Sequence, residues 1–186
     1  MTTAERLITV DEFSTLPDPP EGGKMELVDG RVVTMPPVGR KHGVVVGRLG
    51  RALGNFADQH ALAEVALGAG FRLFPDRELV RAPDVHSVAT ERLGEFSDEG
   101  LYDSFPDLAV EVLSPDDRDV DMSEKVYEYL AAGTRRVWVV RPKTKSVTVH
   151  RPDGSAQTYT GDSALTSNEA GFSLDGFSLQ LIDLFA

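Results

Sequence analysis

One carboxylate lies in the middle of an otherwise apolar stretch of the chain. The segment DLAVEVL (107–113) is apolar at nearly every position, which predicts a strand buried on both faces of a sheet. Glu111 shares one face of this strand with Asp107, which we expect near the solvent end, too far away to join a site. Because an unpaired buried carboxylate is costly, a bound cation, an arginine partner or a raised pKa should compensate Glu111. The alternative is a structural ion pair or a strand end that reaches solvent.

A second carboxylate, Asp84, stands directly after Pro83 at the predicted entry to another strand. Carboxylates on two adjacent strands can converge on one hard cation, and Mg²⁺ prefers oxygen ligands together with water and phosphate. Asp84 and Glu111 together therefore predict a magnesium site. The alternative for Asp84 is a turn-forming aspartate, which is common near strand starts.

A lysine follows on the next predicted helix, which spans about residues 122–132. Lys125 lies on the border of the apolar face of this helix, from which its side chain could reach along the sheet toward Glu111. Glu124 and Glu128 are expected to point into water on the opposite side. The alternative for Lys125 is a surface lysine whose alkyl chain covers apolar surface while its ammonium stays in water.

Other catalytic arrangements are weaker. Paired carboxylates could act as acid and base on a sugar, but a sugar cleft normally needs aromatic platforms, and Trp138 lies in a strand pattern that predicts burial. Ser114 lacks the neighbouring glycines of a nucleophile elbow. The acidic residues around the start of the 122–132 helix are expected to be solvated or to cap it; they are Asp116, Asp117, Asp119 and Asp121.

These residues must be positioned by a mixture of helices and strands. Two apolar runs around Asp29-Gly30 predict a tight hairpin, and the C-terminal stretch 171–185 is expected to pack as an edge appendage. Helices are predicted in a short N-terminal segment and over about 41–59 and 122–132, and strands over about 64–67, 70–74, 82–88, 107–113, 135–140 and 146–151. This order predicts the α/β class, with a mixed β-sheet flanked by helices, an N-terminal hairpin and C-terminal strands. We expect one domain over 1–186 with its core over about 24–151.

The composition limits the class of protein. The chain has 186 residues and no cysteine, which excludes disulfides, thiolate zinc sites and a cysteine nucleophile. No apolar run approaches the roughly 20 residues of a membrane helix, and no signal-peptide pattern begins the chain, so we expect a cytoplasmic protein. The net charge of −11 argues mildly against a large nucleic-acid footprint. A local basic face stays open as an alternative, because basic residues gather at Arg40, Lys41, Arg48 and Arg51 and again at Arg135, Arg136, Arg141, Lys143 and Lys145.

Six segments follow one another along the chain: ELVDGRVV, KHGVVVGRL, RAPDVHSV, PDLAVEVLSP, SEKVYEYLAAG and RRVWVVRPK. In order and spacing they resemble the Uma-type restriction endonuclease family of the PD-(D/E)XK nuclease superfamily. The resemblance covers roughly residues 26–151, and its most specific part is PDLAVEVLSP followed by EK and AAG. It implies a restriction-endonuclease-like fold and a Mg²⁺-dependent endonuclease acting on DNA, with Mn²⁺ as a substitute ion.

The resemblance also implies roles for single residues. Asp84 would be the motif's aspartate and Glu111 its second acid, both of them metal ligands, with the backbone carbonyl of Val112 as a further ligand. Lys125 would orient the attacking water. The position two residues after the acid, where the motif usually has lysine, is Leu113 here, so the lysine is moved to the following helix.

Two more positions match the family. Glu26 could complete the metal shell or hold a second ion; the alternative is a strand-edge glutamate beside Lys24. His42 lies on the apolar stripe of its predicted helix, where a hydrogen-bonded core histidine is favoured over a catalytic base. In the family an acidic residue usually follows the strand that contains the tryptophan, here Trp138, but this chain has Arg141 at that position. The difference affects surface details more than catalysis. Analogy also implies a homodimer, because cutting two strands needs two sites.

The main alternative is a catalytically silent nuclease-fold module that binds nucleic acid or protein. The net negative charge favours the module. Asp84, Glu111 and Lys125 favour the enzyme, because a module without chemistry has no need of those three residues together.

Overall fold

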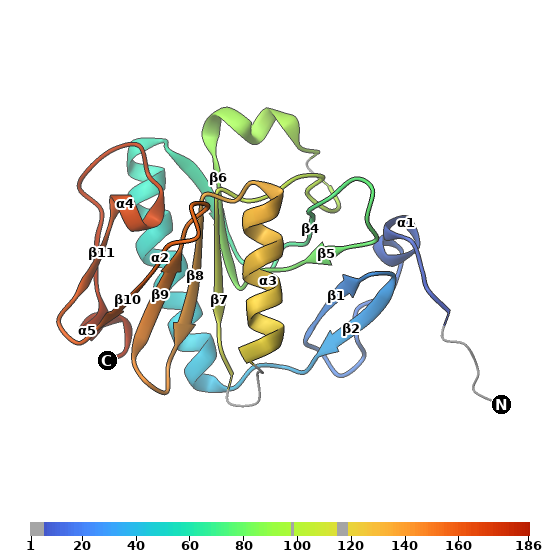
Figure 1. Cartoon of the computed structure of the whole chain (residues 1–186), viewed down its shortest axis with the longest axis horizontal. Coiled ribbons are helices and arrows are strands. Elements are labelled where there is room, and N and C mark those ends of the chain that lie inside the picture. Colours follow the sequence, from blue (N-terminus) through green and yellow to red (C-terminus); the bar gives the residue numbers. More distant parts are fainter. Residues whose placement is uncertain (1–5, 98, 115–118) are drawn as a thin grey trace.

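The computed structural model describes residues 6–97, 99–114 and 119–186. Its largest sheet has six strands in the order β10-β9-β8-β7-β6-β3 (Figure 1). These strands are β3 (Ala63–Ala66), β6 (Val85–Ala89), β7 (Leu108–Val112), β8 (Arg136–Arg141), β9 (Ser146–His150) and β10 (Ala156–Thr160). β7 and β8 are parallel and are joined through α3 (Asp119–Ala132), since a parallel pair requires a crossover connection. Every residue of β7 is buried, which confirms the prediction of a strand covered on both faces.

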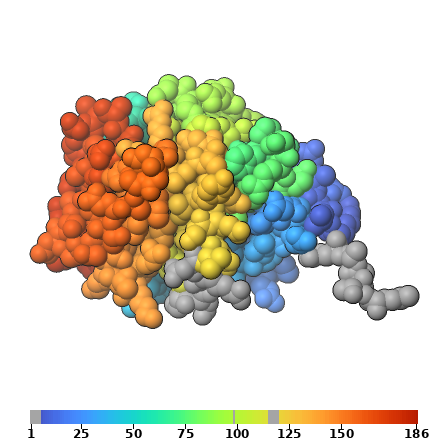
Figure 2. Space-filling view, in the orientation of Figure 1, coloured from blue at the N-terminus to red at the C-terminus, as the bar shows by residue number. Residues whose placement is uncertain are grey.

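Helices cover both faces of this sheet. Leu49 and Leu53 of α2 (Arg40–His60) belong to the same buried cluster as Trp138 of β8. On the other face, Tyr129 of α3 belongs to a cluster with Val139 of β8. Successive residues of β8 thus point to opposite faces. The outer side of α3 lies at the surface, between strands β8–β10 and the N-terminal hairpin (Figure 2).

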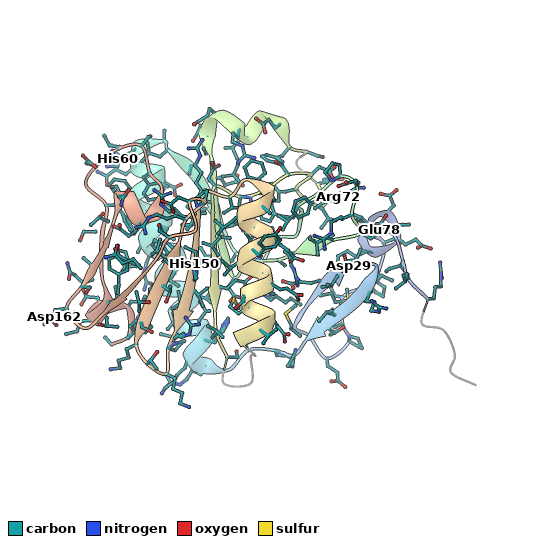
Figure 3. The ribbon with its side chains drawn as sticks, viewed as in Figure 1. Asp29, His60, Arg72, Glu78, His150 and Asp162 are labelled. Carbon is teal, nitrogen blue, oxygen red and sulfur yellow. The ribbon has the colours of Figure 1, made fainter. Side chains whose placement is uncertain are left out.

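A second sheet of four strands has the order β2-β1-β5-β4. Its strands are β1 (Lys24–Val28), β2 (Arg31–Met35), β4 (Phe71–Arg72) and β5 (Val80–Arg81). β1 and β2 form the predicted hairpin, and Asp29 and Gly30 have φ angles of 47° and 79°, the left-handed pair that a type I′ turn requires. Gly30 N–H donates to the carbonyl of Glu78 at 3.0 Å, so Asp29 and Glu78 lie close together in Figure 3.

The strand predicted over about 82–88 is observed as β6, but it begins only at Val85, and a separate strand of the other sheet, β5, ends at Arg81. Pro83 lies between them and has no N–H to donate to a ladder. The chain therefore crosses from the four-stranded to the six-stranded sheet at this point, and Asp84 lies at the crossing. β4 is also shorter than the predicted strand over 70–74.

The C-terminal segment is not the predicted edge appendage. β11 (Ala164–Thr166) and β12 (Ser178–Gln180) form a separate two-stranded sheet, with α4 (Ser167–Ala170) and α5 (Leu181–Leu184) beside them. Leu165, Leu181 and Leu184 are buried in the same cluster as Trp138. Trp138 Nε1–H also donates to the carbonyl of Glu169 at 2.7 Å. These leucines thus complete the α2 side of the core, because they are buried in the cluster that contains Trp138 of the large sheet.

The remaining elements are the predicted N-terminal helix, α1 (Val10–Ser14), and a 3₁₀ helix, η1 (Thr90–Glu95). α3 begins three residues before the predicted start, so Asp121 lies inside the helix and does not cap it. Asp116 and Asp117 lie outside the described residues. Within the ranges described above, no helix combines the length and the apolar character needed to cross a lipid bilayer.

Candidate functional site

Asp84 and Glu111 come together across neighbouring strands, as predicted. Asp84 directly precedes β6, which pairs antiparallel with β7. The Oδ2 atom of Asp84 accepts a hydrogen bond of 2.8 Å from the backbone N–H of Val112. Asp84 is therefore fixed to the residue that follows Glu111 in the chain.

Glu111 is the buried carboxylate that the strand pattern predicted, with only 3% of its surface exposed. Its Oε1 atom accepts a hydrogen bond of 2.9 Å from the Tyr129 hydroxyl and lies 3.6 Å from Lys125 Nζ. Burial raises the pKa of Glu111, although the charges of Lys125 and Lys24 oppose this. Two lysines and a tyrosine thus provide the compensation that a buried carboxylate needs.

Lys125 points into the site and not into water. It is buried, and its Nζ atom donates a hydrogen bond of 2.8 Å to Glu26 Oε1 while lying 3.6 Å from Glu111 Oε1. Burial alone would lower the pKa of Lys125, but the charges of Glu111 and Glu26 raise it. The predicted reach of this lysine from its helix toward Glu111 is observed.

A buried ion network holds Glu26 in place. Glu26 Oε2 accepts a hydrogen bond of 2.9 Å from Arg81 Nη1, and its Oε1 accepts one of 3.1 Å from the N–H of Ala82. Arg81 Nε also donates to Glu128 Oε2 at 2.6 Å. The prediction that Glu128 points into water is wrong, because the residue is only 5% exposed. Helical periodicity identifies the faces of α3, but it does not reveal that β5 of the smaller sheet covers the face that carries Glu128.

Lys24 is a site residue that the sequence did not identify. Its Nζ atom donates to the carbonyl of Ala82 at 2.7 Å and to Asp84 Oδ1 at 2.9 Å, and it lies 4.0 Å from Glu111 Oε2. The signal that could have found it is the spacing of two residues from Glu26, which places both side chains on one face of β1. A lysine at the start of a strand is too common on protein surfaces for this spacing to carry weight.

His42 faces the site from the first turn of α2. Its side chain is 8% exposed, and its Nε2 atom lies 3.2 Å from Asp84 Oδ2. His42 is therefore the predicted hydrogen-bonded buried histidine, and its partner belongs to the site. Burial opposes the ionisation of Asp84, but the bond to His42, the charge of Lys24 and the N–H of Val112 lower the pKa of Asp84 to about 2.

Residues 10–181 match the model of the Uma2 family, described as "Putative restriction endonuclease". The chain belongs to this family. The crystal structure of a "putative nuclease belonging to DUF820" from Anabaena variabilis ATCC 29413 has a similar fold, with a TM-score of 0.78 and 22% sequence identity over 96% of this chain and 97% of that one. No protein of curated function matches the chain. The predicted family and the mixed α/β fold that it implied are confirmed.

The donor set of this Uma2 family member suits a hard cation that keeps much of its water. In the described part of the chain, no three His, Asp or Glu side chains are grouped so that they could hold a metal ion. Asp84 Oδ1 and Glu111 Oε2 nevertheless both face one cation, the ammonium of Lys24. Mg²⁺ is commonly bound by one or two carboxylates, with water and phosphate completing its shell. Asp84 and Glu111 are therefore the residues that could hold a metal.

Exposed basic residues lie at both ends of the strands of the six-stranded sheet. β8 runs parallel to β7, and α2 begins beside Asp84, so the turn after β8 and the start of α2 lie at the sheet edge that carries the site. The exposed basic residues of this edge, which we call the basic edge, are Arg40, Lys41, Lys143 and Lys145. Arg135 lies at the opposite end, near Asp107, which is far from the site as predicted.

A groove of about 500 Å³ lies on another side of α3, lined by Met122, Ser123, Val126, Tyr127, Leu130, Val139, Arg141 and His150. His150 is labelled in Figure 3 on the strands beside α3. None of the predicted site residues lines this groove, so it is separate from the carboxylate cluster.

Proposed function

We propose that the chain is a metal-dependent endonuclease that hydrolyses the phosphodiester bonds of DNA. One observation carries the proposal: the outer oxygens of Asp84 and Glu111 face a single cation position, with the amine of Lys125 3.6 Å from Glu111. Membership of the Uma2 family supports the same reading. Two acids that hold a metal ion, with an amine nearby, can together catalyse phosphodiester hydrolysis.

Asp84 and Glu111 would hold Mg²⁺, or Mn²⁺ as a substitute, with the backbone carbonyl of Val112 as a further ligand. The bound ion would polarise the scissile phosphate and lower the pKa of a water molecule. His42 and the N–H of Val112 hold the Oδ2 atom of Asp84, which leaves its Oδ1 atom directed toward the cation position. These contacts orient the aspartate before substrate binds.

Lys125 would orient the attacking water and offset the negative charge that develops on the oxygens of the phosphorane-like transition state. Glu26 keeps the amine in place through the 2.8 Å hydrogen bond, and Arg81 in turn holds Glu26. The oxygens of Glu26 accept hydrogen bonds from Lys125, Arg81 and the N–H of Ala82, so its contacts favour a positioning role over the ligand role. His42 likewise positions Asp84 through its Nε2 atom.

The basic edge supports DNA as the substrate. Phosphate contacts normally come from Lys and Arg, and Arg40, Lys41, Lys143 and Lys145 lie at the sheet edge that carries the site although the net charge is −11. We further propose a homodimer, because cleavage of both strands of a duplex needs two sites. Sedimentation velocity of the full chain would test this part, and a single monomeric species at all concentrations would refute it.

Cleavage of plasmid DNA with Mg²⁺ or Mn²⁺ tests the catalytic assignment. Glu111→Gln should abolish metal-dependent cleavage and leave the circular dichroism spectrum intact, because it removes a ligand charge without changing volume. Glu124→Gln, an exposed residue of α3, is the matched control and should cleave like the wild type. Unchanged cleavage by Glu111→Gln would remove this residue from the mechanism.

Lys125→Ala should keep metal binding but lose turnover. The amine contacts Glu26 and Glu111 in this structure and has no place among the proposed ligands. Loss of metal binding with an intact fold would contradict its assigned role. Calorimetry with Mn²⁺ measures the binding, and single-turnover cleavage measures the chemistry.

The second candidate is a catalytically silent module that binds nucleic acid or protein, which the net charge of −11 favours. Calorimetric titration of Mg²⁺ or Mn²⁺ into wild type and Asp84→Ala separates the two candidates. The enzyme predicts binding heat in the wild type alone. Heat in both proteins, or in neither, would favour the module.

A further inference from the structure

Each of the two site acids has one oxygen held by the protein frame and one oxygen directed toward Lys24. Asp84 Oδ2 is held by Val112 N–H and lies beside His42, whereas its Oδ1 lies 2.9 Å from Lys24 Nζ. Glu111 Oε1 is held by the Tyr129 hydroxyl, whereas its Oε2 lies 4.0 Å from the same Lys24 Nζ. The ammonium of Lys24 therefore stands where the two outward oxygens converge.

The surroundings of this ammonium are those of a metal ion. Besides the two carboxylates, Lys24 Nζ donates to the backbone carbonyl of Ala82 at 2.7 Å. Carboxylate and carbonyl oxygens are the ligands of hard divalent cations. None of the catalytic or metal-binding roles proposed above involves Lys24.

From these contacts we infer that Lys24 is a tethered counter-ion: its ammonium occupies the cation position between Asp84 and Glu111, and a divalent cation binds there by displacing it. This inference rests on the proposed function. Without a positive charge between them, the two acids would repel each other at short range in a partly buried site. A divalent cation carries twice the charge of the ammonium and would be repelled by it at this position. The ion can therefore bind there only when the ammonium has left.

The displaced ammonium has a route out of the site. The Lys24 side chain is 26% exposed, compared with 10% for Asp84 and 3% for Glu111, so the lysine lies on the solvent side of the acids. Its four-carbon stem can move the charge into water without moving β1. The consequence is that Lys24 sets the metal affinity of the site without itself being a ligand.

Calorimetry of Mn²⁺ binding to the full chain tests the inference. Lys24→Met keeps the length of the stem and removes the charge, so Mn²⁺ should bind about tenfold more tightly or better, which corresponds to roughly 1.4 kcal/mol. Lys41→Met is the control, because Lys41 is exposed and precedes His42, so it removes a nearby charge that no carboxylate of the site contacts. Its Mn²⁺ affinity should change by less than about twofold, since exposed charges are screened.

A second measurement uses the wild type and does not depend on how a variant folds. Reductive methylation followed by mass spectrometry reports how readily each lysine amine reacts. Adding Mn²⁺ should increase the labelling rate of Lys24, because displacement brings its amine into water, and should leave that of exposed Lys145 unchanged.

The outcomes separate this inference from the proposed function. Mn²⁺ binding with equal affinity in wild type and Lys24→Met, or Lys24 labelling that Mn²⁺ leaves unchanged, would overturn the counter-ion role while the metal-dependent enzyme stands. Binding in neither protein would overturn both. Tighter binding by Lys24→Met together with faster labelling of Lys24 on addition of Mn²⁺ would support the inference.

Discussion

Replacing Arg81 by methionine should leave two buried carboxylates without the guanidinium that lies between them. Arg81 donates to Glu26 at 2.9 Å and to Glu128 at 2.6 Å. The side chains of Arg81, Glu26 and Glu128 are 6%, 1% and 7% exposed, so water cannot replace these contacts without a structural change. Methionine fills much of the volume of the arginine stem, so the substitution removes mainly charge and hydrogen bonds.

Removing one partner of a buried ion pair costs about 3–5 kcal/mol, because the charge that remains is uncompensated. We expect the Arg81→Met variant to lose stability in this range. For a chain of this size the melting temperature should fall by on the order of 10 °C. Lys125 still contacts Glu26 in the variant, which favours the lower part of the range.

The loss should also depend on pH. Burial opposes the ionisation of Glu26, but the charges of Lys125 and Arg81 outweigh it and hold the pKa of Glu26 below 4.5. A carboxylate with a lowered pKa stabilises the fold above its unfolded-state pKa, and this contribution disappears as the pH falls through the folded-state pKa. The difference between wild type and Arg81→Met should therefore be largest above pH 4.5 and shrink below it.

Urea denaturation followed by circular dichroism measures the free energy of unfolding of each protein. Arg77→Met is the matched control, because Arg77 also lies near Glu128, at 3.6 Å, but is 38% exposed. Exposed ion pairs contribute roughly 0–1 kcal/mol, so the control should remain close to the wild type. A loss of less than about 1 kcal/mol in Arg81→Met would refute the argument that removing Arg81 leaves uncompensated buried charge.

Two further predictions concern single buried groups. Tyr129→Phe removes only the hydroxyl that donates to Glu111 at 2.9 Å, so urea denaturation should show a loss of about 1.5–3 kcal/mol, and an unchanged stability would mean that this bond contributes nothing. Burial lowers the pKa of His86 from 6.5 to about 4, so wild-type stability should fall by roughly 3 kcal/mol as the pH decreases from 6.5 to 4. His86→Leu should lose this part of the pH dependence, and a pH profile identical to that of His60→Gln, an exposed histidine, would contradict the assignment.

Several features of the fold could be predicted from local patterns. The apolar run around Glu111 identified β7, and Asp29-Gly30 identified the hairpin, because these preferences depend on the residues themselves and their immediate neighbours. The same patterns placed Lys125 at the border of its helix face. The C-terminal segment was misplaced because its alternating apolar residues show that one face is buried, but not which part of the molecule buries it.

The sequence predicted the two acids of the site, but it did not predict all of the residues around them. Asp84, Glu111 and Lys125 could be proposed because an acid in an apolar strand and a matching family pattern are visible in one dimension. Lys24 lies outside the matching segments, and Arg81 begins one of them, RAPDVHSV, without an assigned role. Both belong to the four-stranded sheet, and their significance comes from what that sheet faces.

The sequence by itself determined where the main strands and helices form, and it showed that the buried carboxylate of Glu111 needs a compensating partner. Only the tertiary structure decided how those acids are compensated. Glu26 meets Lys125 across 99 positions of the chain, and Arg81 meets Glu128 across 47. The physical reason is that a short-range pattern reports the environment that a residue needs, whereas the partner that supplies it is chosen by how distant sheets and helices pack.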